Sequence, residues 1–233
     1  EGGLSLNGKL APPRMGLLNY IVDDFDPEAR EVIFVPVALN YDRILEDSIL
    51  IAADKSGTRR FKPPLFDVFQ RFVRHVGLRI TGRFRGFGTA SVSFGAPLEL
   101  SQYHAKESED LTEAVAHELM KRIADVTPVL GVPLVSRLIL AHDGITTQQL
   151  EEQVAAALEG LRERKLPSPR RSPPEIVNDA LSRLAGRALV DESTDGVRVT
   201  EAGRDVLAFY AASIAHHFDA GAEKSTKISA AAE

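Results

Sequence analysis

The hydrophobic positions change their spacing near residue 100, from runs typical of strands to a period typical of helices. Residues 31–39 are almost unbroken valine, isoleucine, phenylalanine and leucine, which predicts a strand buried on both faces in a parallel or mixed sheet. Pro36 interrupts this run, and because proline donates no ladder hydrogen bond, we expect the pairing to stop or bend there. The run ends in the polar cluster 40–43, at the kind of strand end where α/β sheets place ligands. Residues 89–94 alternate strictly, which predicts a half-buried strand.

Between these strands, residues 63–77 have the apolar spacing of a helix, with basic residues on the polar side. Three interpretations stay open for this segment: a core helix with a solvated face, an interfacial membrane helix, or a wall of an anionic ligand site.

Two amphipathic helices are predicted beyond residue 100, and a proline-rich break follows them. Their apolar stripes are Leu111, Val115, Leu119 and Ile123 for the first, and Leu150, Val154, Leu158 and Leu161 for the second. Thr146 and Thr147 are the candidate caps of the second helix. After the break at 165–174 we expect a helix over 175–185, a hairpin joining 188–190 to 197–199, and a helix over 200–218.

The predicted fold class is therefore α/β, with two parts and a tail. Residues 1–100 form part of an α/β domain, and residues 101–218 form a mainly helical domain with a winged-helix-like end. The small and polar residues 219–233 are predicted to be a disordered tail.

Charge is segregated along the chain, although the net charge is only −5. Residues 55–88 hold nine lysines and arginines against one acid, whereas residues 99–160 hold eleven acids against four bases. An anionic partner would therefore meet the first half. The chain has no cysteine, which excludes disulfides and thiolate chemistry.

The sequence lacks the motifs of several kinds of catalytic and metal site. No Gly-x-Ser-x-Gly elbow is present, and the six histidines show no metal-ligand spacing, so we expect neither metal nor cofactor. The arginines and glycines at 82–88 suit an anion-binding loop or a turn with a basic rim. The winged-helix-like end would suit DNA, but Arg183 and Arg187 against Asp179 supply too little positive charge, so no nucleic acid is expected.

Four stretches, in order along residues 1–218, resemble the glycerol-3-phosphate acyltransferases. Residues 1–18, with Glu-Gly-Gly, Gly-Lys-Leu and Pro-Pro, are similar to the family's third acyltransferase block and its lead-out, and residues 35–46 are similar to its fourth block. Residues 88–98 resemble the strand that closes the acyltransferase domain. Residues 207–216 resemble the Leu-x-Tyr-Tyr stretch and its following histidine near the carboxyl terminus.

The resemblance implies that a histidine and an aspartate, separated by four residues, act as the base and its orienting acid. No histidine of this chain has that partner, so the resemblance implies that the catalytic pair lies upstream and that this chain holds the acceptor-binding half. The substrate-binding residues it implies are Glu1, Gly2, Gly3, Ser5, Lys9 and Pro36. The glycine turn would approach the phosphate, and Pro36 would mark the strand end beside the acyl donor.

One departure from the family concerns the acceptor. Many members carry arginines where this chain has Leu4 and Leu6, and leucine cannot bind a dianion. Either other cations such as Lys9 or Arg14 replace them, or the acceptor differs.

The implied function is transfer of a fatty acyl group from acyl-CoA or acyl carrier protein to glycerol 3-phosphate, in phospholipid synthesis. The implied location is the cytoplasmic side of the cell membrane, with peripheral attachment to the lipid surface. The alternative is a non-enzymatic module that binds anions or nucleic acid.

Overall fold

The computed structural model describes residues 5–57, 88–104 and 110–219. The elements in chain order are α1 (Gly16–Asp23), β1 (Ile33–Phe34), β2 (Val37–Tyr41), α2 (Asp47–Ser56), β3 (Ala90–Phe94), β4 (Leu98–Glu99), α4 (Leu100–His104), α5 (Leu111–Val126), α6 (Gly131–Ala141), α7 (Thr147–Glu163), α8 (Pro173–Ala185), β5 (Val190–Ser193), β6 (Gly196–Val199) and α9 (Glu201–Ala212). The described structure is thus a mixed α/β fold that is mostly helical.

The strands of the described residues pair only in antiparallel twos: β1 with β4, β2 with β3, and β5 with β6. The prediction of a parallel or mixed sheet over 31–39 is therefore wrong for this part of the chain. The predicted break at Pro36 is confirmed, because β1 ends before it and β2 begins after it. Proline has no N–H to donate, but the carbonyl of Pro36 accepts a hydrogen bond of 2.8 Å from the backbone N–H of Gly95.

The β2–β3 pair turns its large apolar side chains away from the rest of the protein. The register pairs Val37 with Phe94 and Leu39 with Val92, and directly paired residues share a face. These four side chains are exposed, whereas Ala38 and Asn40 on the other face are buried towards α5. The prediction of a strand buried on both faces is therefore also wrong. The half-buried strand predicted for 89–94 is confirmed, and its small residues, Ser91 and Ser93, are the ones on the partly buried face.

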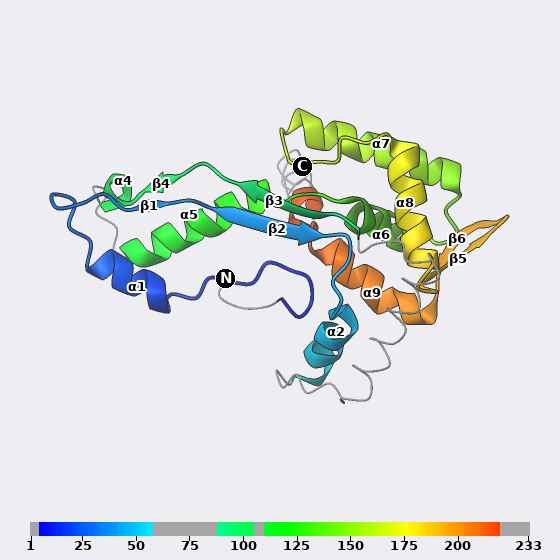
Figure 1. Ribbon diagram of the computed structural model, residues 1–233, viewed down its shortest axis with the longest axis horizontal. Helices are drawn as coiled ribbons and strands as arrows, with labels where there is room; N and C mark the ends of the chain where they lie inside the picture. The colour runs from blue at the N-terminus through cyan, green and yellow to red at the C-terminus, as the bar shows by residue number, and fades with distance from the viewer. Residues whose placement is uncertain (1–4, 58–87, 105–109, 220–233) are drawn as a thin grey trace, which may run out of the picture.

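A helical core forms the other end of the molecule. Helix α6 lies in its middle and packs on α7, α8 and α9 (Figure 1). The stripe of α7 points into this core, and Leu150, Val154, Leu158 and Leu161 are all buried. The β5–β6 hairpin joins α8 to α9, as the sequence predicted.

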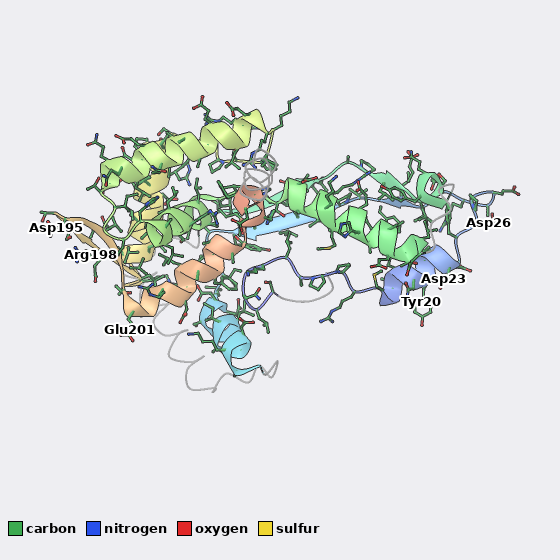
Figure 2. The ribbon with its side chains drawn as sticks, turned by 180° about the vertical axis from the view of Figure 1, so that it is seen from behind. Tyr20, Asp23, Asp26, Asp195, Arg198 and Glu201 are labelled. Carbon is green, nitrogen blue, oxygen red and sulfur yellow. The ribbon has the colours of Figure 1, made fainter. Side chains whose placement is uncertain are left out.

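A smaller cluster joins α1, α5 and the β1–β4 pair at the opposite end. Its buried members are Val22, Leu98, Leu100 and Val115. Seen from behind (Figure 2), Tyr20, Asp23 and Asp26 mark this end, and Asp195, Arg198 and Glu201 mark the helical end.

The helix predictions for α5, α7 and α8 are confirmed, and the last helix is shorter than predicted. Helix α9 ends at Ala212, where the Ser213 hydroxyl donates to the carbonyl of Tyr210 at 2.8 Å. Helix α6 was missed, and the predicted helix over 63–77 and residues 220–233 of the predicted tail 219–233 lie outside the described residues.

Candidate functional site

A pocket of about 690 Å³ lies where β2 ends, β3 begins and α6 begins. This volume is typical of small-molecule sites. Its wall combines Asp42, Thr89 and Ser91 from the strand ends with residues 128–131 before and within α6, and with Arg162 and residues 166–171 after α7. The pocket thus lies at the strand end where the sequence predicted a ligand.

Asp42 joins the strand pair to the start of α6. Its carboxylate accepts hydrogen bonds from the backbone N–H groups of Thr89 and Val132, both at 3.0 Å. Val132 lies in the first turn of α6, where the helix dipole favours a negative charge, and Asp42 is 2 % exposed. Gly88 has a φ of +93°, and a Cβ there would lie 2.6 Å from the Cβ of Asp42, so only glycine suits this approach.

The pocket has an apolar floor and a basic rim. Val129 and Leu130 are buried in the floor. The rim carries Arg162, Arg170 and Arg171. The backbone N–H of Val129 donates to the carbonyl of Pro167 at 2.9 Å, which fixes the proline-rich segment against the start of α6.

A largely buried ion pair joins α2 to the helical core. The carboxylate of Asp47 lies 2.7 Å from a guanidinium nitrogen of Arg187, just after α8, and accepts a hydrogen bond of 2.7 Å from the hydroxyl of Tyr210 on α9. The Tyr210 hydroxyl also accepts from the backbone N–H of Ile44 at 3.0 Å. Burial alone would lower the pKa of Arg187, but its hydrogen bond and attraction to Asp47 outweigh this and raise that pKa. Burial, with the charge of Asp47, raises the pKa of Tyr210.

Asn40 makes a second link between β2 and the helices. Its side-chain amide donates to the carbonyl of Pro128 at 2.8 Å and to the hydroxyl of Ser213 at 3.3 Å. Asn40 and Asp42 of the polar cluster are therefore committed to internal contacts, whereas Tyr41 between them is exposed.

Two adjacent histidines close the carboxyl end of the described chain onto α5. The Nε2 atoms of His216 and His217 donate to the carbonyls of Ala124 and Thr127, at 3.1 and 2.7 Å. Burial lowers the pKa of His216 to about 4, with the neighbouring His217 adding to the effect, and burial also lowers the pKa of His217. Both rings are therefore neutral at physiological pH.

The sequence model described as "Glycerol-3-phosphate acyltransferase C-terminal region" matches residues 78–222, which is more than half of the chain. This chain belongs to that family. The resemblance read from the four stretches is thereby confirmed.

Curated relatives are distant and much longer. The chain is 30 % identical over 115 residues to the "Glycerol-3-phosphate acyltransferase" of Pseudomonas syringae pv. syringae, covering 48 % of this chain and 13 % of that protein. It is 26 % identical over 177 residues to the protein of the same name from Pseudomonas aeruginosa, covering 68 % of this chain and 20 % of that protein. The chain thus matches at most a fifth of the length of these relatives.

The substrate-binding residues predicted for this family member are dispersed among the described residues. The Ser5 hydroxyl donates to the carbonyl of Lys9 at 2.8 Å, so these two share one turn. Pro36 is buried at the other end of β2 from the pocket. Glu1, Gly2 and Gly3 lie outside the described residues, and none of the described hydrogen bonds joins Ser5 or Lys9 to Pro36.

The amino-terminal turn packs on the last helix of this family region. Gly8 has a φ of +81°, and a Cβ there would lie 2.0 Å from the carbonyl oxygen of Phe209. Leu6 packs against the helical core. Leu6, one of the two positions where the resemblance implies arginine in many members, therefore has a packing role in this chain.

Sequence reasoning missed the arginines of the pocket rim: Arg170 and Arg171 lie in residues 165–174, which read as a linker, and Arg162 lies at the end of α7. The only signal was the pair Arg170 and Arg171 between prolines, whose place beside Asp42 depends on tertiary packing. In the described part of the chain, no group of three or more histidines, aspartates and glutamates could hold a metal ion.

Among the described residues no single helix is long and apolar enough to cross a membrane, and only α5 and α6 together, bent by 88°, meet the requirement as a pair.

Proposed function

We propose that this chain is part of a glycerol-3-phosphate 1-O-acyltransferase. The enzyme would transfer a fatty acyl group from acyl-CoA or acyl carrier protein to glycerol 3-phosphate in phospholipid synthesis. The family match over residues 78–222 supports this assignment. The chain contains no histidine followed at the family's spacing by aspartate, so its own role is to complete the acceptor half of the site rather than to move the proton.

The observation that carries this proposal is the open apolar face of the β2–β3 pair. Val37, Leu39, Tyr41, Val92 and Phe94 are between 38 and 67 % exposed, and all project from one face. Contiguous apolar surface of this kind marks an interaction surface rather than a solvated one. A two-stranded pair is also too small to be stable without packing on further structure.

The proposed occupant of this face is the remaining part of the acyltransferase domain. The named relatives are much longer than the matched region, so their length leaves room for such a domain. The inner face of the pair is already held by Asn40 and Asp42 against the start of α6. The helical part would thus set the position and tilt of the strands that the catalytic half packs upon.

We place the enzyme at the cytoplasmic side of the cell membrane, attached peripherally. The acyl chain of donor and product is apolar, so a site near the lipid surface shortens the path of the product into the bilayer. The nucleic-acid alternative is not favoured, because Arg183 on α8 binds Asp179 and Arg187 just after α8 binds Asp47.

A test combines this chain with a relative. The chain alone, incubated with radiolabelled glycerol 3-phosphate and acyl-CoA, is expected to give no acylated product. A chimera in which residues 78–222 replace the matching region of the Pseudomonas aeruginosa protein is expected to give product. A second chimera that carries residues 31–222 is expected to give product as well, and its Leu39→Lys/Val92→Lys variant is expected to lose this activity.

Turnover by the isolated chain would overturn the assignment of catalysis to residues outside it. A folded chimera without activity would argue against the acyltransferase role. Tight binding of duplex DNA that falls steeply with salt would favour the binding-module alternative.

A further inference from the structure

The pocket beside Asp42 has more positive than negative charge on its wall. Arg162, Arg170 and Arg171 contribute three guanidinium groups, and Asp42 contributes the single carboxylate. Because Asp42 accepts hydrogen bonds from two backbone N–H groups, its charge is directed at the start of α6 rather than at the rim. An anion entering the pocket would therefore meet mainly guanidinium groups.

Two of the three arginines are available to a ligand. Arg171 binds Asp179 at 3.2 Å, and Asp179 also binds Arg183 at 2.8 Å. Within residues 5–57, 88–104 and 110–219, no hydrogen bond or ion pair is made by the side chains of Arg162 and Arg170. These two guanidinium groups are the ones that a ligand can engage without breaking an existing pair.

The rim is set on backbone that is already fixed. Val129 donates to Pro167, and Pro167 and Pro169 each restrict their own φ angle. Arg171 lies beside the start of α6, since a Cβ on Gly131 would be 4.0 Å from its Nη2 atom. The positive end of the helix dipole and the guanidinium thus meet at one wall of the pocket.

We propose that this pocket binds an organic phosphate. Arg162 and Arg170 would hold the phosphate, since guanidinium groups match phosphate oxygens in two-pronged hydrogen bonds. The carbon part of the ligand would lie on the floor formed by Val129, Leu130 and Leu166. A volume of about 690 Å³ exceeds what a bare phosphate ion needs and suits a ligand with such a carbon part.

The proposed function suggests two ligands that could supply the phosphate. Only the choice of these two ligands rests on the proposed function. The phosphate could be that of glycerol 3-phosphate, the proposed acceptor, or one of those on coenzyme A, the carrier of a proposed donor. The site itself does not depend on acyl transfer.

The test is a titration of the isotopically labelled 233-residue chain, followed by the NMR signals of its backbone amides. The probes are inorganic phosphate, glycerol 3-phosphate and coenzyme A, at constant ionic strength. We expect the amides of Gly131 and Ser168 to shift with the organic phosphates. The double variant Arg162→Ala/Arg170→Ala should bind at least about tenfold more weakly, because both charged donors are lost.

Two matched variants distinguish the effect of losing this site from the effect of changing the net charge. Arg198→Ala/Arg204→Ala removes the same charge from the β5–β6 hairpin and α9, away from the pocket, and should bind like the parent chain. Arg162→Lys/Arg170→Lys keeps the charge but not the planar fork, and should fall between the parent and the alanine variant.

The outcomes are separable from those of the acyltransferase assay. Tighter binding of glycerol 3-phosphate supports an acceptor site, and tighter binding of coenzyme A supports a donor site. Equal affinity in the parent and in Arg162→Ala/Arg170→Ala overturns the proposal, as do shifts confined to amides outside the pocket. An inactive chimera whose region still binds phosphate would overturn the proposed function and leave this site standing.

Discussion

The helical part, α6 to α9, and the strand pair β2–β3 place their apolar side chains in opposite directions. In the helical part the large apolar residues point inward and form one core that includes Leu134, Leu158 and Leu207. In the strand pair they point outward, and the inner face carries alanine, asparagine and serine. The helical part therefore has a core of its own, whereas the strand pair leaves its large apolar side chains exposed.

Polar side chains in and after β2 join the strand pair to the helical part. Asp42, Asn40 and Asp47 all lie in or after β2 and all bond to the helical part. Polar contacts depend on geometry more than apolar packing does, so these bonds hold the strand pair in one orientation. The apolar face is then presented in a fixed direction.

The largest expected effect compares one leucine from each region. Leu207→Ala should lower the free energy of unfolding by about 4 kcal/mol, because it opens a cavity in a core position that is 0 % exposed. Leu39→Ala, at 58 % exposed, should change it by less than about 0.5 kcal/mol. Urea unfolding followed by far-ultraviolet circular dichroism measures both.

Similar losses for the two variants would contradict the comparison. A large loss for Leu39→Ala would mean that the apolar face is covered in the isolated chain, for instance by a second copy. Sedimentation of that variant and of the parent would show whether self-association accounts for it.

A smaller loss is expected where the two regions are joined. Asp47→Asn should cost about 3 kcal/mol, since it leaves the partly buried Arg187 without its counter-charge. The control is Asp54→Asn, which makes the same chemical change on an exposed position of α2 and should be close to neutral. If both variants unfold alike, the ion pair does not hold α2 to the helical part.

The sequence predicted the helical part better than the strand pair, and the burial pattern explains the difference. Helices α5 and α7 have one buried face each, so their stripes are visible in the sequence. Helix α6 was missed because it is buried around most of its circumference, which leaves an apolar run without a period. The burial predicted for residues 31–39 was wrong because apolar strand positions normally face inward. In this structure the large apolar side chains of β2 face solvent.

The candidate site could also be predicted only in part from the sequence. The polar cluster at the end of β2 could be recognised as a strand end, and the structure does place Asp42 in a pocket. The arginines of the rim lie more than a hundred residues further along, and only packing of the proline-rich segment on residue 129 brings them there. No local spacing could have joined them.

The pH dependence tests the histidines that close the helical part onto α5. The pKa of His216 is about 4 in the folded chain and near 6.5 when unfolded, so between these values the unfolded state binds more protons. The free energy of unfolding should therefore be fully retained above pH 6.5 and fall as the pH drops towards 4. The slope should reach up to about 1.4 kcal/mol per pH unit for one proton.

His216→Gln should flatten this slope, because glutamine can donate to the carbonyl of Ala124 without titrating. The control, His142→Gln, changes an exposed histidine and should keep the parent slope. Urea unfolding between pH 7.5 and 5.5 isolates the histidines, since carboxylates titrate mainly below that range. An unchanged slope in His216→Gln would contradict the assignment.

The smallest expected change in the free energy of unfolding concerns the cap at the start of a helix. Helix α7 begins with a capping box: the Thr146 hydroxyl accepts from the N–H of Gln149 at 3.2 Å, and the Gln149 side chain accepts from the N–H of Thr146 at 3.0 Å. Helix α1 has no side-chain cap, and its N-cap residue is Met15. Thr146→Ala should cost about 1 kcal/mol, whereas Thr147→Ala, which removes no cap, should be near neutral in urea unfolding. A reversed order would assign the cap to Thr147, and equal small effects would mean that packing alone, without local helix signals, makes the helical part the self-sufficient region.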